Sequence, residues 1–222
     1  MTDMPRVFIG YDPRQPLAYN TLQHSILRHA SKPVSITALV LKQLPITRRG
    51  LTEFTFSRFL VPYLCGYKGT AVFMDADIVV TGDICELFEQ SQPLMAVQVM
   101  KNQANFEWPS VLLFNCALCK MLTPEFVDDS ANQLFDLAWA KDRVGTFSDE
   151  WNHCVGYSEN KEAKLYHYTQ GIPAFWETSG LPEDVHWNIE RKALTDTVSW
   201  KELMGGSVHA KPVLQRMLKR YV

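Results

Sequence analysis

Short apolar runs alternate along the chain with longer amphipathic stretches, a pattern typical of α/β proteins. Apolar or alternating runs of strand length lie at residues 7–11, 34–41, 71–74, 94–99, 110–114 and 164–168. Helical spacing of apolar residues lies at 17–27, 56–64 and 124–141, and the last of these has the clearest pattern. We therefore predict one α/β domain over residues 1–222, with a mixed, mostly parallel sheet flanked by helices.

The composition agrees with a folded globular domain. Of the 222 residues, 46% are hydrophobic and 21% are charged, and a chain of this size can bury a core without disulfides or metals. The formal net charge of -2 is spread along the sequence, which argues against nucleic acid as a partner. The basic segment from Lys211 to Arg220 predicts a solvated terminal helix, with weak contact with an anionic membrane as the alternative.

Nothing at the N-terminus resembles an export signal, and no stretch reaches the roughly 18 apolar residues of a membrane span. We therefore expect a cytoplasmic protein. The five cysteines are then predicted to be reduced thiols in the core. Cys116 and Cys119 have a spacing that suits zinc, but no second pair of this kind follows them.

Asp75 and Asp77 follow the apolar run 71–74 and are the strongest candidates for chemistry. In open α/β sheets, ligands bind beyond the carboxyl ends of strands, where this pair is predicted to lie. Two carboxylates held this close repel each other unless a cation lies between them, and Mg²⁺ and Mn²⁺ often bind to such pairs together with substrate phosphates. The alternative is a strand end with two solvated aspartates that stabilise a turn.

The acidic pair belongs to a longer pattern of residues. Its central block comprises Phe56 to Leu60, Ala71 to Val80 and Asp83 to Phe88. Weaker matches flank this block at Ile9 to Asp12, Phe114-Asn115, Asp149-Glu150, Asn152, His167, Gly171, Pro173 and Trp176. Together these residues resemble glycosyltransferase family 8. The resemblance implies a retaining, Mn²⁺-using enzyme with the Rossmann-like GT-A fold and a UDP-sugar donor, bound mainly by residues from about 5 to 120.

The resemblance implies a metal and nucleotide site. Asp75, Asp77 and His167 would coordinate Mn²⁺, or Mg²⁺, between the two phosphates of the donor. Arg58 would contact the phosphate or the sugar, because a guanidinium offers paired hydrogen-bond donors. Further donor-binding positions would be Ile9, Gly10, Tyr11, Asp12, Ala76 and Gly171, with Tyr11 stacking on the base and Asp12 accepting from its polar edge.

The resemblance places Asn115, Asp149 and Glu150 at the donor sugar. Retaining glycosidases use a carboxylate nucleophile, and Asp149 or Glu150 could have that role. The alternative is a front-face reaction, in which the departing phosphate guides the acceptor and no enzyme nucleophile is needed. The acceptor, whether a glycan, a lipid, a protein or a small molecule, is not specified by the sequence, because acceptor pockets are built from variable loops.

The sequence departs from the family pattern in two places. The family has a lysine before its late Pro-Trp pair, and the segment from Pro173 to Trp176 has none. Lys211 is the candidate for replacing it, and the same segment makes His209 an alternative to His167 as the third metal ligand. In addition, Glu150 stands where the family has an amide.

Structural interpretations of these residues stay open at this point. Arg58 could pair with Glu53 or Asp83 on the surface, His167 could be an interior histidine with a satisfied hydrogen bond, and Tyr11 could lie at the edge of the core.

Two other functions also fit parts of the sequence. In a haloacid-dehalogenase-type phosphatase, Asp75 would be the nucleophile and Asp77 the general acid. That chemistry needs a later acidic pair after a strand, whereas Asp128 and Asp129 fall within a predicted helix. The second alternative is a relative that binds a nucleotide sugar but has lost activity, and the missing lysine is its only support.

Overall fold

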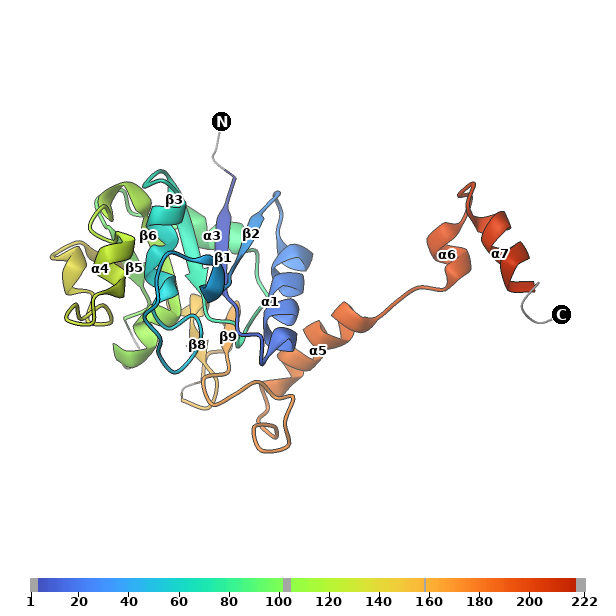
Figure 1. Ribbon diagram of the computed structural model, residues 1–222. Coiled ribbons are helices and arrows are strands. Elements are labelled where there is room, and N and C mark those ends of the chain that lie inside the picture. Colours follow the sequence, from blue (N-terminus) through green and yellow to red (C-terminus); the bar gives the residue numbers. More distant parts are fainter. Residues whose placement is uncertain (1–3, 102–104, 158, 219–222) are drawn as a thin grey trace.

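The central sheet contains six strands in the order β2-β1-β3-β6-β5-β7 (Figure 1). The computed structural model describes residues 4–101, 105–157 and 159–218. The strands are β1 (Arg6–Gly10), β2 (Ser35–Leu39), β3 (Thr70–Met74), β5 (Val97–Val99), β6 (Val111–Asn115) and β7 (Val144–Thr146). β6 runs antiparallel to both of its neighbours, and the other five strands run parallel to one another. The predicted mixed, mostly parallel sheet is confirmed.

A second, smaller sheet lies beside the central one, and three residues separate the end of β3 from its first strand. It contains β4 (Ile78–Val80), β9 (Leu165–His167) and β8 (His153–Cys154), in the order β4-β9-β8. β9 is antiparallel to β4 and parallel to β8. The hydrophobic pattern predicts β9 but not β8, because a strand of two residues has no periodicity to detect.

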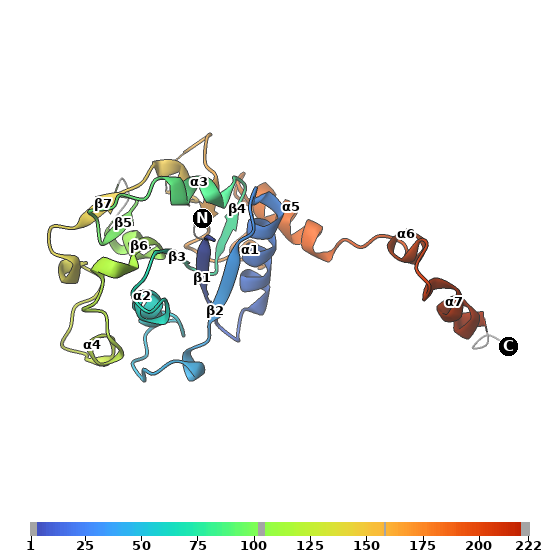
Figure 2. The same cartoon turned by 90° about the horizontal axis from the view of Figure 1, so that it is seen from above.

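Helices cover both faces of the central sheet. α1 (Pro16–His29) and α2 (Val61–Leu64) lie on opposite faces, and α5 (Asp184–Thr195) packs beside α1 (Figure 2). Because both faces are covered, β1 and β3 are apolar and buried along most of their length. The predicted helix at 17–27 is confirmed as part of α1. The helix predicted at 56–64 consists of the 3₁₀ turn η2 (Ser57–Leu60) followed by α2.

Two side chains at the end of α1 fasten it to α5. Arg28 and His29 lie in its last turn, where positive charge complements the helix dipole. Their side-chain nitrogens lie 2.7 and 3.0 Å from the Oε1 atom of Glu190 on α5. The buried residues of α5 are Asp184, Trp187 and Glu190. Two of these three are acidic, so the buried face of α5 is not an apolar stripe. The hydrophobic pattern of the sequence therefore does not predict this helix.

The helix predicted from Pro124 to Lys141 is wrong beyond its first turn. α4 (Pro124–Asp128) ends where Nη1 of Arg48 donates to the carbonyl oxygens of Val127, in its last turn, and of Asp129, directly after it, at 3.2 and 2.7 Å. The Asp128 carboxylate accepts from the main-chain nitrogen atoms of residues 47 and 48. The apolar residues that follow are buried one by one from an irregular chain that contains the short turn η5 (Ala138–Ala140).

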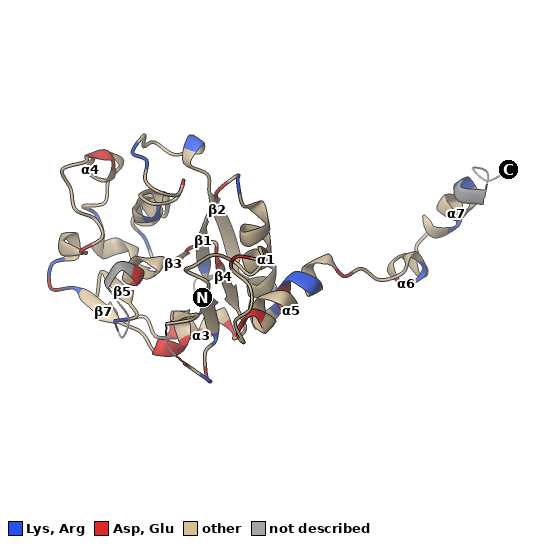
Figure 3. Ribbon diagram, turned by 90° about the horizontal axis from the view of Figure 1, so that it is seen from below, with Lys and Arg blue, Asp and Glu red and all other residues tan. Residues whose placement is uncertain are grey.

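The C-terminal helices α6 (Trp200–Met204) and α7 (Ala210–Leu218) extend away from the sheets (Figure 1). The predicted terminal basic helix is present over residues 210–218, where α7 carries Lys211 and Arg216 and no acidic residue (Figure 3), while Lys219 and Arg220 of the predicted segment lie outside the described residues. Within the described residues, no helix has both the length and the apolar character needed to cross a membrane.

Toward the middle of the chain, α3 (Ile84–Glu89) follows Asp83, whose carboxylate accepts a hydrogen bond from the main-chain nitrogen of Cys85 and so caps the helix.

All five cysteines are free thiols, and four of them are buried. Cys65 is half-buried, so the prediction of reduced core thiols is confirmed for Cys85, Cys116, Cys119 and Cys154. Among the described residues, the groups of side chains that could hold a metal include neither Cys116 nor Cys119.

Candidate active site

The turn from β3 to β4 contains Asp75, Ala76 and Asp77, at the carboxyl end of the central parallel strands. β4 then pairs with β9 so that Ile78 lies opposite His167. One residue beyond this pair, the main-chain nitrogen of Tyr168 donates to the carbonyl oxygen of Asp77 at 2.9 Å. Strand pairing therefore brings a histidine 90 residues further along the chain next to the acidic turn.

Asp75, Asp77 and His167 form a cluster in which one potential ligand atom from each side chain lies within 4.8 Å of the others. His167 Nε2 is 3.3 Å from Asp77 Oδ1. The Oδ1 atoms of Asp75 and Asp77 are both buried, and each has one charged or titratable neighbour: Arg58 Nη2 lies 2.8 Å from the first, and His167 Nε2 lies 3.3 Å from the second. Two carboxylates and an imidazole nitrogen gathered at this distance are a ligand set that fits a divalent cation such as Mn²⁺ or Mg²⁺. The structure thus brings together the three residues predicted to be metal ligands.

The electrostatics of this cluster reflect two acids and a histidine held out of water. Burial raises the pKa of Asp75 to about 6; Arg58 counteracts this effect and Asp77 adds to it. Burial alone would lower the pKa of His167, but attraction to the Asp77 carboxylate and a hydrogen bond with it raise that pKa well above its usual value. Without a cation the cluster therefore favours extra protons, and a divalent cation could displace them.

Arg58 lies inside the molecule and holds Asp75 in place. Its Nη2 is 2.8 Å from Asp75 Oδ1, and its Nη1 donates to the carbonyl oxygen of Pro109 at 2.7 Å. The guanidinium also lies over the Phe73 ring, 4.8 Å from its centroid. The interpretation of Arg58 as a surface residue paired with Glu53 or Asp83 is therefore wrong. Its contact with a donor phosphate or sugar stays a prediction.

The residues at the end of β1 lie beside η2. Ile9 and Gly10 are buried, and a Cβ atom on Gly10 would come within 2.3 Å of the Phe54 ring. Tyr11 is half-buried and packs edge-to-face against Tyr19, with ring centroids 5.4 Å apart. The Asp12 carboxylate accepts from Arg14 Nε at 2.9 Å, and this hydrogen bond holds the pKa of Asp12 below its usual value. The predicted contacts with the base stay untested.

Asn115 does not lie near the acidic cluster, contrary to the prediction. It ends β6 and pairs with Thr70 at the start of β3, whereas the start of β6 lies beside Asp75. The reason is that β6 runs antiparallel, so its carboxyl end lies at the opposite edge of the sheet. The Asn115 side chain donates to the Pro93 carbonyl oxygen at 2.9 Å. At the site edge, the residue in the corresponding place is Ser110, whose carbonyl oxygen accepts from the Asp75 nitrogen at 2.9 Å.

Asp149 and Glu150 lie in the turn η6 (Asp149–Trp151), which precedes β8. Asp149 is exposed. Glu150 forms an ion pair with Lys164 at 3.1 Å, and Lys164 also pairs with Glu86 at 2.5 Å. The structure gives Glu150 a cationic partner that the sequence analysis did not identify, and a catalytic role for either acid stays a prediction.

The structure places Gly171 close to the cluster and Lys211 and His209 far from it. Gly171 has a φ of +114° in the loop after β9 and lines a cavity of about 180 Å³ beside Tyr168, which follows His167. Lys211 lies on α7 and His209 directly precedes that helix, so both belong to the arm that Figure 1 shows apart from the sheets. The structure therefore brings His167, and not His209, to the acidic pair.

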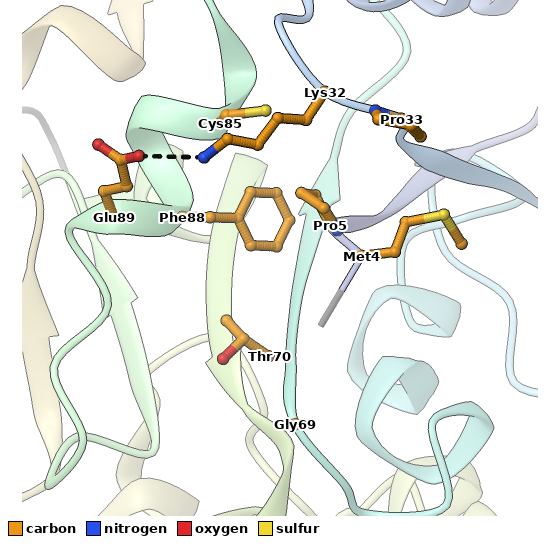
Figure 4. A pocket seen from close by; sticks show the side chains of 9 residues that line it. All are labelled: Met4, Pro5, Lys32, Pro33, Gly69, Thr70, Cys85, Phe88 and Glu89. Carbon is orange, nitrogen blue, oxygen red and sulfur yellow. Dashed lines mark ion pairs between the residues drawn. The ribbon is translucent and has the colours of Figure 1, made fainter. Parts of the chain in front are cut away.

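A larger cavity, of about 690 Å³, lies at the opposite edge of the central sheet (Figure 4). Pro5 before β1 and Thr70 at the start of β3 line it, together with Phe88. An ion pair between Lys32 and Glu89, with 3.5 Å between its charged atoms, lies at its side. Its position at the amino ends of the parallel strands separates it from the acidic cluster.

Comparisons with known proteins give one relative in sequence and several in fold. No protein-family model matches the chain. Protein CDI from Arabidopsis thaliana is 33% identical over 207 residues, with 77% of this chain and 79% of that protein covered. Among solved structures, the WbbM bifunctional glycosyltransferase has a TM-score of 0.60 at 16% identity, covering 86% of this chain and 52% of that one.

Two further glycosyltransferase structures have the same fold. GlyE of Streptococcus pneumoniae TIGR4 has a TM-score of 0.61 at 18% identity, over 86% of this chain and 63% of that one. The galactosyltransferase LgtC, in complex with donor and acceptor sugar analogues, has a TM-score of 0.58 at 10% identity, over 89% and 99%. The chain thus spans 52% of WbbM and 63% of GlyE. At these identities the likeness shows a shared GT-A fold.

Proposed function

The chain belongs to the same family as Protein CDI of Arabidopsis thaliana, and we propose that it is a glycosyltransferase that moves a sugar from a nucleotide-sugar donor to an acceptor. The observation that carries the proposal is the cluster of Asp75, Asp77 and His167 at the carboxyl end of the central strands. In open α/β sheets this edge is where ligands bind. The GT-A fold supports the same reading.

The finer proposal is a UDP-sugar donor, Mn²⁺ as the metal and retention of configuration at the sugar. Asp75 and Asp77 would bind the metal through their buried oxygens and His167 through Nε2. When bound, the metal would act as a Lewis acid that takes up the negative charge developing on the leaving diphosphate. Arg58 would keep the Asp75 carboxylate ionised and oriented toward the cluster, since its guanidinium lies 2.8 Å from Oδ1.

The path of the sugar is proposed to be a front-face reaction. The two acids predicted near the sugar give little support to an enzyme nucleophile, because Asp149 is exposed and Glu150 is paired with Lys164. The phosphatase alternative gains no support either. Its later acidic pair would include Asp128, whose carboxylate instead accepts from Thr47 and Arg48 at the end of a helix.

Calorimetric titration with UDP, with and without Mn²⁺, tests the proposal. We expect binding that requires the metal and that is lost in Asp77→Ala, because the diphosphate then loses one side of its metal clamp. Glu89→Gln is the matched control: it removes an exposed acid at the opposite edge of the sheet and should bind normally. If the wild-type protein binds no UDP in either condition, the proposal is wrong and phosphatase assays come next.

A further inference from the structure

The second ring nitrogen of His167 faces away from the acidic pair into a buried polar group. Three atoms surround Nδ1: the Oδ1 of Asn152 at 3.2 Å, the Oε2 of Glu107 at 3.6 Å and the Sγ of Cys154 at 3.8 Å. All four residues are buried, and Asn152 is completely inaccessible to solvent. His167 therefore has a carboxylate on each side of its ring, Asp77 at Nε2 and Glu107 at Nδ1.

Main-chain geometry fixes this group. Glu107 lies on the turn η3 (Asn105–Ser110), which leads into β6, and its Oε2 accepts from the Ser110 hydroxyl at 2.9 Å. Asn152 precedes β8, which pairs in parallel with β9, and its Nδ2 donates to the Glu107 carbonyl oxygen at 3.2 Å. Since the carbonyl oxygen of Ser110 also accepts from the Asp75 nitrogen, one turn connects Glu107 to the acidic pair.

The position of the ring proton decides which nitrogen of His167 can bind a metal. A neutral histidine carries one ring proton, and only the other nitrogen has a lone pair free for a metal. The Asn152 amide oxygen, at 3.2 Å, can accept a proton held on Nδ1, and the negative charge of Glu107, at 3.6 Å, favours a proton on that side of the ring. The lone pair of Nε2 is then left on the side where Asp75 and Asp77 lie. Partners of this kind orient metal-binding histidines, and their loss typically weakens metal binding by 10- to 100-fold.

We propose that Glu107 and Asn152 are positioning residues that hold the proton of His167 on Nδ1 and direct Nε2 toward the metal. The inference rests on the proposed function, because it concerns the metal of that site. It adds two residues that lie outside the acidic turn and act through His167. Cys154, although close to Nδ1, has no such role, because a thiol is a weak acceptor.

Direct Mn²⁺ binding to the purified protein without nucleotide, followed by electron paramagnetic resonance of the free ion, is the first measurement. We expect Glu107→Leu and Asn152→Leu to raise the Mn²⁺ dissociation constant about 10- to 100-fold. Glu107→Gln keeps an amide oxygen as acceptor and should recover most of the affinity. Cys154→Ala is the matched control, and we expect its affinity to stay within about twofold of the wild-type value.

The outcomes separate this inference from the proposed function. If the wild-type protein binds neither Mn²⁺ nor UDP with Mn²⁺, the proposed function is wrong and this inference falls with it. If the wild type binds Mn²⁺ and folded Glu107→Leu binds it equally well, the positioning role alone is wrong. The same holds if Cys154→Ala is the variant that loses the metal.

A second measurement needs no substitution at all. In the wild-type protein saturated with Mg²⁺ and UDP, the ¹⁵N spectrum of the His167 ring should show the proton on Nδ1. A proton on Nε2 would overturn the proposal, even if the leucine variants do not fold.

Discussion

Arg58 and Asp75 form an ion pair inside the protein, with 2.8 Å between Nη2 and Oδ1 and less than a tenth of either residue exposed. Because both residues are buried, solvent is poorly placed to compensate either charge if its partner is removed. Burial and the neighbouring Asp77 both raise the pKa of Asp75, and Arg58 is the main group that opposes them. The ion pair therefore keeps a candidate metal ligand ionised as well as in place.

Replacing Arg58 with methionine should destabilise the protein by about 3 kcal/mol, because it leaves a buried carboxylate without its partner. The loss should be smaller near pH 5 than near pH 8, since Asp75 can take up a proton at the lower pH. Urea unfolding of the variant and the wild type at both pH values measures this loss of stability. In the double variant Arg58→Met/Asp75→Asn, the loss of stability should be much smaller than the sum of the two single losses, because no unpaired carboxylate remains buried. Additive losses, or a loss below about 1 kcal/mol, would argue against the pair.

Asp149 and Glu150 offer a test of the reaction path. Because Glu150 pairs with Lys164 and Asp149 is exposed, we expect Glu150→Gln and Asp149→Asn each to keep turnover within about threefold of the wild type, a loss of less than 1 kcal/mol. Turnover is measured once a donor sugar is found by screening. A loss of a thousandfold or more in Asp149→Asn would contradict the front-face proposal and assign that carboxylate to the chemistry.

The sequence was informative where chemistry is local. Asp75 and Asp77 could be predicted because they directly follow a buried strand, and the end of a strand is where α/β proteins bind ligands. The partners of these residues were harder to predict. Glu107 and Asn152 reach His167 only through the pairing of β8 with β9 and the turn before β6, so no spacing in the sequence connects them.

Strand direction explains the clearest error at the site. The Phe114-Asn115 pair matches a family pattern, but β6 is antiparallel, so the end of β6 that carries Asn115 lies away from the acidic cluster. Apolar patterning failed for a different reason after Pro124. Arg48, 76 residues earlier in the chain, takes the carbonyl groups that a longer helix would need.

The C-terminal arm gives a third prediction. α7 and the segment before it lie apart from the acidic cluster, so Lys211→Ala and His209→Ala should each leave the affinity for UDP with Mn²⁺ within about twofold of the wild type. His167→Ala, by contrast, should abolish metal-dependent binding. Calorimetric titration of the three variants with UDP and Mn²⁺ measures these affinities. A tenfold loss in Lys211→Ala would mean that the arm folds over the donor when it binds, and that this lysine replaces the one missing from the late motif.

The last prediction concerns His153, which is buried and whose two ring nitrogens form no hydrogen bond with the described residues. Its Nε2 lies 4.0 Å from Glu183 Oε1, and its ring packs edge-to-face against Tyr166 with 5.5 Å between centroids. Burial lowers the pKa of His153; Glu183 partly offsets this effect and His186 adds to it. A histidine whose pKa is lowered by folding takes up its proton more readily in the unfolded chain. It therefore costs stability as the pH falls below about 6.5.

His153→Phe keeps the ring packing but removes this titration. Relative to the wild type, the free energy of unfolding of the variant should rise as the pH falls from 8 to 5. Glu183→Gln removes the attraction that favours the protonated ring, so it should make the stability of an otherwise wild-type protein fall more steeply over the same range. Urea unfolding at pH 8, 6.5 and 5 measures both differences. A His153→Phe variant that parallels the wild type at every pH would show that His153 titrates alike in the folded and unfolded chains, and that Glu183 fully offsets its burial.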